Sequence, residues 1–330
     1  MTDMPPFTAP WWLRNAHGMT ILPKFWPRTR VDPFRPVERR LFTVAPGTQI
    51  LGYCHWQSDR VAAPTMVLLH GLEGSSESHY MLGLTDKGWA AGLNIVRLNQ
   101  RTCGGSEALS PTLYNSGLSH DFRAALEELS KQDGLDQLWF VGYSMGGNLA
   151  LKMAGEAGSA LPSLCGLIAV SPNIDPTVCV QALEQPANRL YHEYFVRGLK
   201  ARLARKAALS PGRWDISALA GIRTIRAFDD LYTAPDGGYE GVADYYDRSG
   251  ARHVLDGIHV PTTIFSAMDD PFIPISMFEA ASIRRNPWIR LCLTNHGGHC
   301  GFLQRDRVGE DRFWVENRIV ELIVNGSATR

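Results

Sequence analysis

The sequence predicts an α/β protein with a mostly parallel central sheet that is covered by helices on both faces. Three observations support this class. Short runs of β-branched and large apolar residues alternate along the chain with stretches of helical periodicity. The first two of these runs are joined by the turn-forming residues "APGT", which predicts a hairpin at the start of the sheet. A glycine-rich turn, "FVGYSMGGN", lies between an apolar strand and a helix, as functional turns of such sheets do.

The expected strands follow one another along the chain as short apolar runs bounded by turn residues. They span residues 37–44, 49–56, 65–69, 93–98, 138–142, 166–170, 262–267 and 289–294. Helices are expected where apolar residues recur at helical spacing, over residues 80–91, 119–131, 145–155, 275–282 and 311–324. Because helices separate the strands that follow the hairpin, those strands are expected to run parallel.

One long segment interrupts this alternation. From about residue 175 to residue 259 the chain has helix-like stretches, Pro and Gly breaks and clustered aromatic residues, without a convincing buried strand. We therefore expect a helical cap at residues 175–259, inserted before the strand at 262–267. The core would comprise residues 1–174 and 260–330, with residues 1–36 as an N-terminal arm.

Composition and charge narrow the class of protein. The 330 residues include 33 basic and 33 acidic side chains, so the formal charge is zero, and a nucleic-acid partner, which usually requires a basic excess, is not expected. The six cysteines include no CxxC pair, and "MTDMPPFTAP" lacks the layout of a signal peptide. We expect a cytoplasmic location. Apolar runs are shorter than the roughly 18 residues that span a bilayer, so any membrane contact would be peripheral.

The strongest chemical signal is Ser144 in the form G-x-S-x-G, with Gly142 and Gly146 on either side. A serine held out of a sharp strand-to-helix turn has a strained backbone, and the residues two before and two after it must be small. The helix that follows also directs its amide dipoles toward the turn. We predict that Ser144 is a nucleophile.

A nucleophilic serine needs a base, and the base needs an acid that fixes its tautomer. In α/β-hydrolases these groups follow the serine in the order acid, then histidine. The residues "AMDDPFIP" come directly after the expected strand at 262–267, at the edge of the sheet where ligands usually bind. Asp270 is the predicted acid because it begins the turn-forming D-P-x-x-P pattern, and Asp269 is the alternative.

The predicted base follows the last expected strand, in the residues "TNHGGHC". His299 is favoured because Gly297 and Gly298 allow the loop to turn back and present the next side chain to the serine. His296 is the alternative base. The stretch could also suggest a metal site, but a zinc site needs three or four ligands at workable spacing, and neither CxxC nor HExxH accompanies it. We expect no metal ion and no cofactor.

Acyl transfer also needs hydrogen-bond donors for the oxyanion of the tetrahedral intermediate. In this fold one donor is the backbone N–H of the residue after the nucleophile, which is Met145 here. The other comes from the loop after the third strand, which begins "HGLEG", and we assign it to the N–H of Leu72. The alternative is that His-Gly only ends the strand.

Further motifs are distributed along much of the chain. They are "NAHGMTILP", "HGLEGSSES", "NQRTCGGSE", "GYSMGGNLALK", "FDDLYTAPDGGY", "DDPFIP" and "HGGHCGF". Together they make the sequence, from about Trp12 to Phe302, resemble the YheT-like hydrolases, which are related to eukaryotic ABHD-type esterases and lipases. The resemblance implies an α/β-hydrolase fold with a helical cap and a triad of Ser144, Asp270 and His299 that acts on carboxylic esters. One departure is "NAHGMT", where relatives usually have a His-Leu-Gln-Thr run; it concerns the N-terminal arm and leaves the triad intact.

These groups predict a serine hydrolase that cleaves carboxylic esters through an acyl-enzyme, with a small-molecule ester or a lipid of short to medium acyl length as substrate. An acyltransferase that passes the acyl group to an alcohol would use the same triad. A non-catalytic binding protein on this scaffold is a weaker alternative, because such proteins usually lose a triad member.

Two features of the expected cap bear on partners. In "FVRGLKARLARKAAL" apolar residues recur at i, i+4 spacing among basic ones, so the helix could lie on an anionic membrane surface through Arg202 and Arg205. The favoured interpretation is a cap helix with a solvated basic face, and the membrane-surface helix is the alternative. In "FDDLYTAP", Asp229 and Asp230 are expected to anchor the cap or begin a helix, with a direct catalytic role as the alternative.

Overall fold

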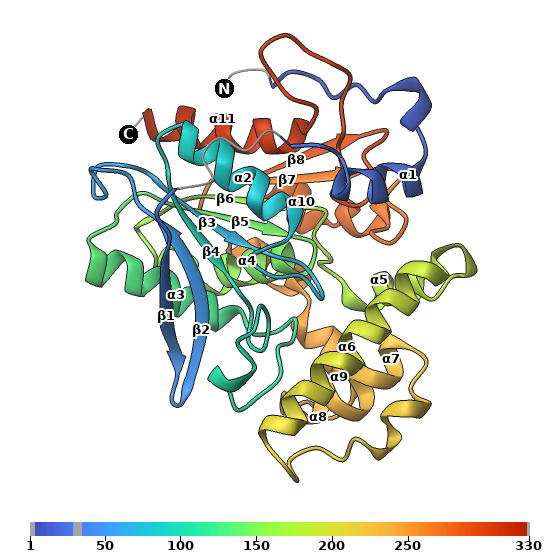
Figure 1. Ribbon diagram of the computed structural model, residues 1–330. Helices are drawn as coiled ribbons and strands as arrows, with labels where there is room; N and C mark the ends of the chain where they lie inside the picture. Colours follow the sequence, from blue (N-terminus) through green and yellow to red (C-terminus); the bar gives the residue numbers. More distant parts are fainter. Residues whose placement is uncertain (1–3, 29–34, 329–330) are drawn as a thin grey trace.

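The computed structural model describes residues 4–28 and 35–328. Its centre is an 8-stranded sheet with the strand order β1-β2-β4-β3-β5-β6-β7-β8 (Figure 1). The strands are β1 (Glu38–Ala45), β2 (Thr48–His55), β3 (Thr65–Leu69), β4 (Asn94–Leu98), β5 (Leu138–Tyr143), β6 (Leu164–Val170), β7 (Thr262–Ala267) and β8 (Ile289–Thr294). β1 and β2 form an antiparallel hairpin, β2 pairs antiparallel with β4, and the remaining neighbours are parallel. The predicted fold class is confirmed.

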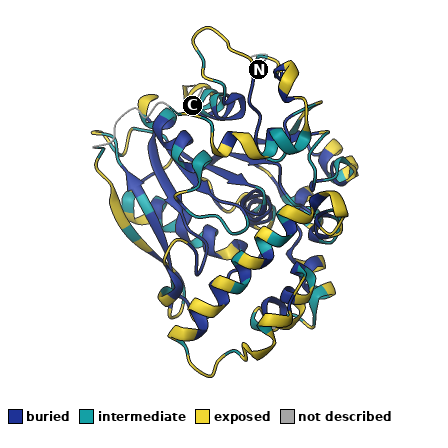
Figure 2. Ribbon diagram, turned by 45° about the vertical axis from the view of Figure 1, so that its right-hand side comes forward, coloured by how far each residue is buried: buried dark blue, intermediate teal, exposed yellow. Residues whose placement is uncertain are grey.

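The middle strands are buried on both faces, which explains their nearly continuous apolar sequences. Alternate residues of β3 contribute to different cores: Val67 belongs to one apolar cluster and Met66 to another. The first cluster includes residues of α3 (Ser119–Asp133) and α4 (Met145–Ala157), and the second includes residues of α2 (His79–Ala90) and α11 (Trp314–Ala328). Figure 2 shows these buried strands between helices that are exposed only on their outer faces.

Two predicted helices differ from the structure. The segment predicted as a helix over 275–282 forms a 3₁₀ turn, η9 (Ile275–Glu279), and a short helix, α10 (Ala281–Arg285), because Ala280 between them is extended. The helix predicted from 311 begins only at Trp314. The residue directly before it, Phe313, forms an antiparallel bridge with Leu303 in place of a helical turn.

The chain between β6 and β7 contains helices and turns in place of strands. These elements are α5 (Pro176–Leu183), η4 (Pro186–Asn188), α6 (Arg189–Leu209), η5 (Ser217–Gly221), α7 (Ile225–Phe228), the π-helix η6 (Asp229–Thr233), α8 (Ala234–Asp236), α9 (Val242–Ser249), η7 (Ala251–His253) and η8 (Leu255–Gly257). Figure 1 shows α6 to α9 grouped beside one end of the sheet. We keep residues 175–259 as the proposed cap and use that name below.

The predicted N-terminal arm, residues 1–36, lies partly outside the described residues, which omit 1–3 and 29–34. Its described part contains η1 (Trp11–Leu13), α1 (Ala16–Ile21) and η2 (Leu22–Lys24). Throughout the described ranges, no helix combines the length and the apolar composition needed to cross a bilayer.

Candidate active site

Ser144 occupies the sharp turn between β5 and α4. Its φ of 53° and ψ of −118° are unusual for a residue with a side chain, and the surrounding structure must therefore hold the turn in place. A Cβ on Gly142 would lie 2.2 Å from the carbonyl oxygen of Gly146, and one on Gly146 would lie 2.5 Å from the carbonyl oxygen of His70. The contacts are with backbone, which cannot move aside, so only glycine fits at either position.

The two predicted oxyanion donors lie beside this serine. Met145 is the first residue of α4, where backbone N–H groups have no partner within the helix. The loop after β3 passes so close that a Cβ on Gly71 would lie 3.0 Å from the Cβ of Ser144. Leu72, the next residue, lines the same cavities as Ser144. This arrangement leaves the N–H groups of Met145 and Leu72 as the predicted oxyanion donors.

His70 holds the loop after β3 in its tight turn. Its Nε2 accepts the backbone N–H of Gln100 at 3.2 Å, so Nδ1 carries the proton and donates to the carbonyl of Gly71 at 2.8 Å. The side chain of Gln100 donates to the carbonyl of His70 at 2.7 Å. Full burial lowers the pKa of His70 to about 4, which keeps the ring neutral. Sequence reasoning treated His70 only as the end of a strand and the start of a loop, and it did not identify the contribution of Gln100.

The loops after β7 and β8 bring Asp270 and His299 together. The Nδ1 of His299 lies 2.9 Å from Oδ2 of Asp270, and the two side chains are 11% and 0% exposed. The other carboxylate oxygen accepts the backbone N–H groups of Phe272 and Ile273, at 3.1 and 3.0 Å. A carboxylate can only accept, so Nδ1 of His299 donates and Nε2 is left to take a proton.

Burial and charge act in opposite directions on His299. Burial by itself lowers the pKa of the imidazole, but the neighbouring Cys300 and the Asp270 carboxylate outweigh it and raise the pKa above its ordinary value. The environment therefore favours the charged imidazolium, which is the form that a general base reaches during catalysis.

The alternative acid and base form a second pair. The Nδ1 of His296 lies 3.2 Å from Oδ2 of Asp269, and their side chains are 36% and 19% exposed. Oδ1 of Asp269 accepts the backbone N–H of Gly298 at 2.9 Å. His296 lines a pocket formed with the N-terminal residues and β8, whereas His299 lines a groove that also includes Ser144. The structure thus separates the two pairs and places only Asp270–His299 with the serine.

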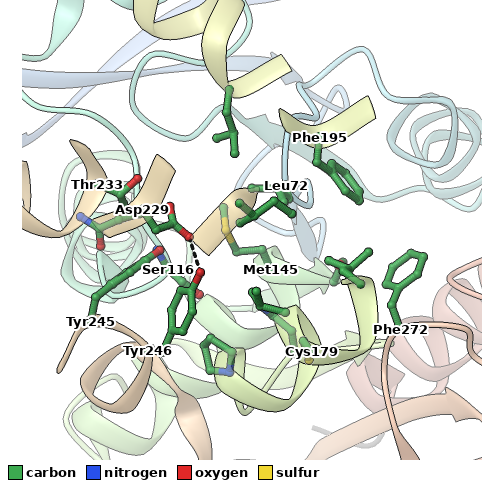
Figure 3. Close-up of a pocket in the computed structure, with 18 of the residues that line it drawn as sticks. Leu72, Ser116, Met145, Cys179, Phe195, Asp229, Thr233, Tyr245, Tyr246 and Phe272 are labelled. Atoms are coloured by element: carbon green, nitrogen blue, oxygen red, sulfur yellow. Dashed lines mark hydrogen bonds between the residues drawn. The ribbon is translucent and has the colours of Figure 1, made fainter. Parts of the chain in front are cut away.

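Ser144 lies where two cavities meet. One is an open groove of about 910 Å³, which also includes His299 and Cys300. The other, called the inner cavity below, has a volume of about 70 Å³ and extends between the core and the cap (Figure 3). Besides Ser144, the residues that line both are Leu72, Phe195 and Phe272. The serine can therefore contact a ligand that has one part in each cavity.

Residues 64–306 match the family model described as the alpha/beta hydrolase fold. The chain belongs to the α/β-hydrolase family. Among relatives, this hydrolase is 33% identical to the putative esterase YheT of Escherichia coli (strain K12), over 92% of its own length and 89% of that protein's. It is 28% identical to phospholipase ABHD3 of Mus musculus, over 89% of its length and 72% of the relative's. The predicted resemblance to the YheT-like branch, with its esterase- and lipase-type members, is confirmed.

Solved structures support the fold of this hydrolase. A 2,6-dihydroxy-pseudo-oxynicotine hydrolase superposes with a TM-score of 0.61 at 18% identity, covering 88% of this chain and 69% of that one. An esterase of Pyrococcus furiosus superposes with a TM-score of 0.56 at 13% identity, covering 99% of both chains. At such identities the similarity establishes the architecture alone.

The N-terminal arm of the hydrolase supports the loop that carries His299. The hydroxyl of Thr20 accepts the backbone N–H of His299 at 2.9 Å and donates to the carbonyl of Ala16 at 2.7 Å. His17 contacts the hydroxyl of Tyr191 in the cap, with 3.1 Å between Nδ1 and the oxygen. The arm therefore links the base loop to the cap. The motif "NAHGMTILP" contains these residues, but sequence reasoning assigned them no contact with the site.

Helix α6 joins the cap to the loop after β3 through Arg202. Its guanidinium makes two hydrogen bonds to Glu73, 3.0 Å from Nε to Oε1 and 3.2 Å from Nη2 to Oε2, and both side chains are 7% exposed. The interpretation that Arg202 presents charge to an anionic membrane is wrong, because its carboxylate partner and burial remove it from the surface. Arg205 is bound to Glu107 at 2.8 Å while its side chain is 56% exposed, so a surface role for this residue stays a prediction.

Proposed function

We propose that this hydrolase cleaves carboxylic esters through an acyl-enzyme on Ser144. The observation that supports it best is the buried Asp270–His299 pair on the same groove as a serine held at a strained turn. Nucleophile, base and orienting acid are then present in the arrangement that acyl transfer requires. The esterase and phospholipase names of the relatives agree with this chemistry.

In the first half of the proposed reaction, Nε2 of His299 accepts the proton of Ser144 as the hydroxyl oxygen attacks the ester carbonyl. The N–H groups of Met145 and Leu72 would stabilise the oxyanion. The imidazolium, stabilised by Asp270, then gives its proton to the departing alcohol. In the second half, water replaces the alcohol, His299 activates it, and the acyl group leaves as a carboxylic acid.

The two cavities suggest how an ester would be placed. The acyl group stays on Ser144 while the alcohol leaves and water arrives, so the open groove suits the alcohol side and the inner cavity suits the acyl chain. A cavity of about 150 Å³ accommodates benzene, and the inner cavity has about 70 Å³. We infer that short acyl chains are preferred.

The test is a panel of p-nitrophenyl esters of increasing acyl length, hydrolysed by the native protein and by Ser144→Ala. We expect the substitution to lower turnover by about four to six orders of magnitude, because it removes the nucleophile. A fluorophosphonate should label Ser144 in the native protein alone. Turnover by Ser144→Ala close to that of the native protein would overturn the mechanism, and absence of labelling would favour a binding protein. Acyl transfer to an added alcohol in place of hydrolysis would identify an acyltransferase.

A further inference from the structure

The inner cavity has one polar side in an otherwise apolar wall. Most of its lining is aliphatic or aromatic; Asn115, Ser116 and Asn173 of the core contribute polar atoms, and so do Asp229, Thr233, Tyr245 and Tyr246 of the cap. In Figure 3 the four cap residues lie together on one side, while Phe195 and Phe272, which face the open groove as well, lie on the other. The polar side is therefore the part of the cavity that lies away from the entrance.

Asp229 is an unusual residue to find in such a wall. It is 7% exposed, and Oδ2 accepts a hydrogen bond of 2.8 Å from the hydroxyl of Tyr246. Burial raises the pKa of the carboxyl to about 6, although hydrogen bonds from Thr233 and Tyr246 oppose the shift. Within residues 4–28 and 35–328, no lysine, arginine or histidine forms an ion pair with it; the nearby Arg226 is bound to Glu184 instead. A buried carboxylate without a cation is costly to keep in a fold.

Two further observations point to a ligand at this place. The Oδ1 atom of Asn173, which follows β6 and lines the same cavity, is buried without a hydrogen-bond partner. Asp229 and Thr233 are the first and last residues of the π-helix η6. Such helices are rare and occur frequently at functional sites. The polar side thus offers a neutral acceptor without a partner among the described residues, on Asn173, and a buried carboxylate without a cation, on Asp229.

We propose that Asp229, together with Asn173 and Tyr246, binds a hydrogen-bond donor, a hydroxyl or an ammonium group, on the acyl chain of the substrate. The proposal rests on the proposed ester hydrolysis, since it places the acyl chain in the inner cavity. Acceptors on the wall require a donor on the ligand. A plain alkyl chain would leave the carboxylate desolvated and unpaired, and a carboxylate or phosphate on the chain would be repelled.

The experiment compares p-nitrophenyl butanoate with butanoates that carry a hydroxyl at C2 or C3, or an ammonium at C3. We expect at least one donor-bearing ester to have a kcat/KM about tenfold or more above that of butanoate, the gain typical of a hydrogen bond to a charged group. In Asp229→Leu the kcat/KM of the donor-bearing esters should fall to that of butanoate measured on the same variant. Asp229→Asn should keep part of a hydroxyl preference and lose an ammonium preference, which tells the two donors apart.

Asp230→Asn is the matched control, since the neighbouring carboxylate accepts the N–H of Val242 at 3.0 Å and does not line the cavity. Its preference should equal that of the native protein. Equal kcat/KM for all four esters in the native protein, or a preference that survives Asp229→Leu, would overturn the proposal while leaving ester hydrolysis intact.

Binding to Ser144→Ala separates this inference from the proposed reaction, because it needs no turnover. Calorimetry would compare methyl butanoate, methyl 3-hydroxybutanoate and methyl 3-aminobutanoate, which this variant does not cleave. Binding of either donor-bearing ester about tenfold tighter than methyl butanoate supports the donor site even if the native protein cleaves no ester. This gain should be lost in Ser144→Ala/Asp229→Asn for the amine and in Ser144→Ala/Asp229→Leu for both. Equal affinities for the three esters count against it.

Discussion

Two Asp–His pairs with the same chemistry lie side by side on this hydrolase and differ in their surroundings. Both use one aspartate after β7 and one histidine after β8. Asp270–His299 is nearly enclosed and lines the groove of Ser144, whereas Asp269–His296 is partly exposed and lies against the N-terminal residues. The local sequence therefore offers equivalent candidates, and their environment distinguishes them.

The difference shows what burial does to such a pair. Charge interactions are strong where water is excluded and are worth about 0–1 kcal/mol at a solvated surface. In Asp270–His299, called the inner pair below, the carboxylate can thus raise the pKa of the imidazole. Asp269–His296, called the outer pair, contributes mainly the hydrogen bonds that hold its loop in place. Asp269 also accepts the N–H of Gly298, the residue before His299. We infer that the outer pair stabilises the turn at Gly298 that positions His299.

The largest expected contrast is between the histidines. His299→Gln should lower kcat/KM for a p-nitrophenyl ester by about 10⁴- to 10⁶-fold, because no group is left to take the serine proton. His296→Gln should cost less than about tenfold, since it loosens a loop only. Steady-state kinetics on both proteins checks the contrast. Comparable losses would mean that the outer histidine takes part in the reaction.

The aspartates should differ next most. Asp270→Asn should reduce kcat by about 10⁴-fold, because an amide can donate to Nδ1 and so stabilise the wrong tautomer of His299. Asp269→Asn keeps an oxygen for the N–H of Gly298 and should retain most of the activity. The comparison is made at saturating ester. If Asp269→Asn were the more damaging of the two, the assignment of the acid would have to be reversed.

The pH profile should separate the aspartates independently of rate. Asp270 raises the pKa of His299, and the base works only when deprotonated, so activity rises with pH through that pKa. Removing the charge in Asp270→Asn lowers the pKa, and the acid limb of kcat/KM should move to lower pH by about one to three units, even as the maximum falls. Asp269→Asn should leave the limb in place. If the acid limb of kcat/KM shifted only in Asp269→Asn, the proposed pairing of Asp270 with His299 would be contradicted.

The smallest expected effect concerns the arm that supports the inner pair. Thr20→Val removes the hydroxyl that accepts the N–H of His299 and should lower kcat by about tenfold with little change in KM, because the base is displaced and an amide is left unpaired. Thr20→Ser retains the hydroxyl and should restore the rate. Equal kinetics for the valine and native proteins would show that the arm does not position the base.

Much of the fold was predictable from local sequence. The ranges expected for β3, β7 and β8 coincide with the strands observed, because apolar runs between turn residues depend mainly on burial. The helix expected over 275–282 is divided at Ala280, and the one expected from 311 is shortened where Phe313 pairs with Leu303. The bridge between Leu303 and Phe313 has no local signal.

The site was predictable in its parts but not in its pairing. The G-x-S-x-G spacing identified Ser144, although only Gly142 is required by a contact within the turn itself; Gly146 is required by the backbone of His70 in the loop after β3. The same local reasoning kept Asp269 as an alternative to Asp270 and His296 as an alternative to His299. It also placed Arg202 on an exposed helix face. Each of these questions depends on which side chain faces solvent and which faces another loop, and neighbouring residues in a loop share the same local pattern.

The sequence by itself determined the fold class, the family and the set of candidate residues, because periodicity and turn chemistry act between near neighbours. Only the tertiary structure decided which Asp–His pair is enclosed with Ser144 and that Thr20 and Gln100 support the site. It also decided that Arg202 is paired with Glu73 and that Asp229 faces the inner cavity. These contacts join residues far apart in the chain. Burial and pairing of this kind arise only when the folded elements meet.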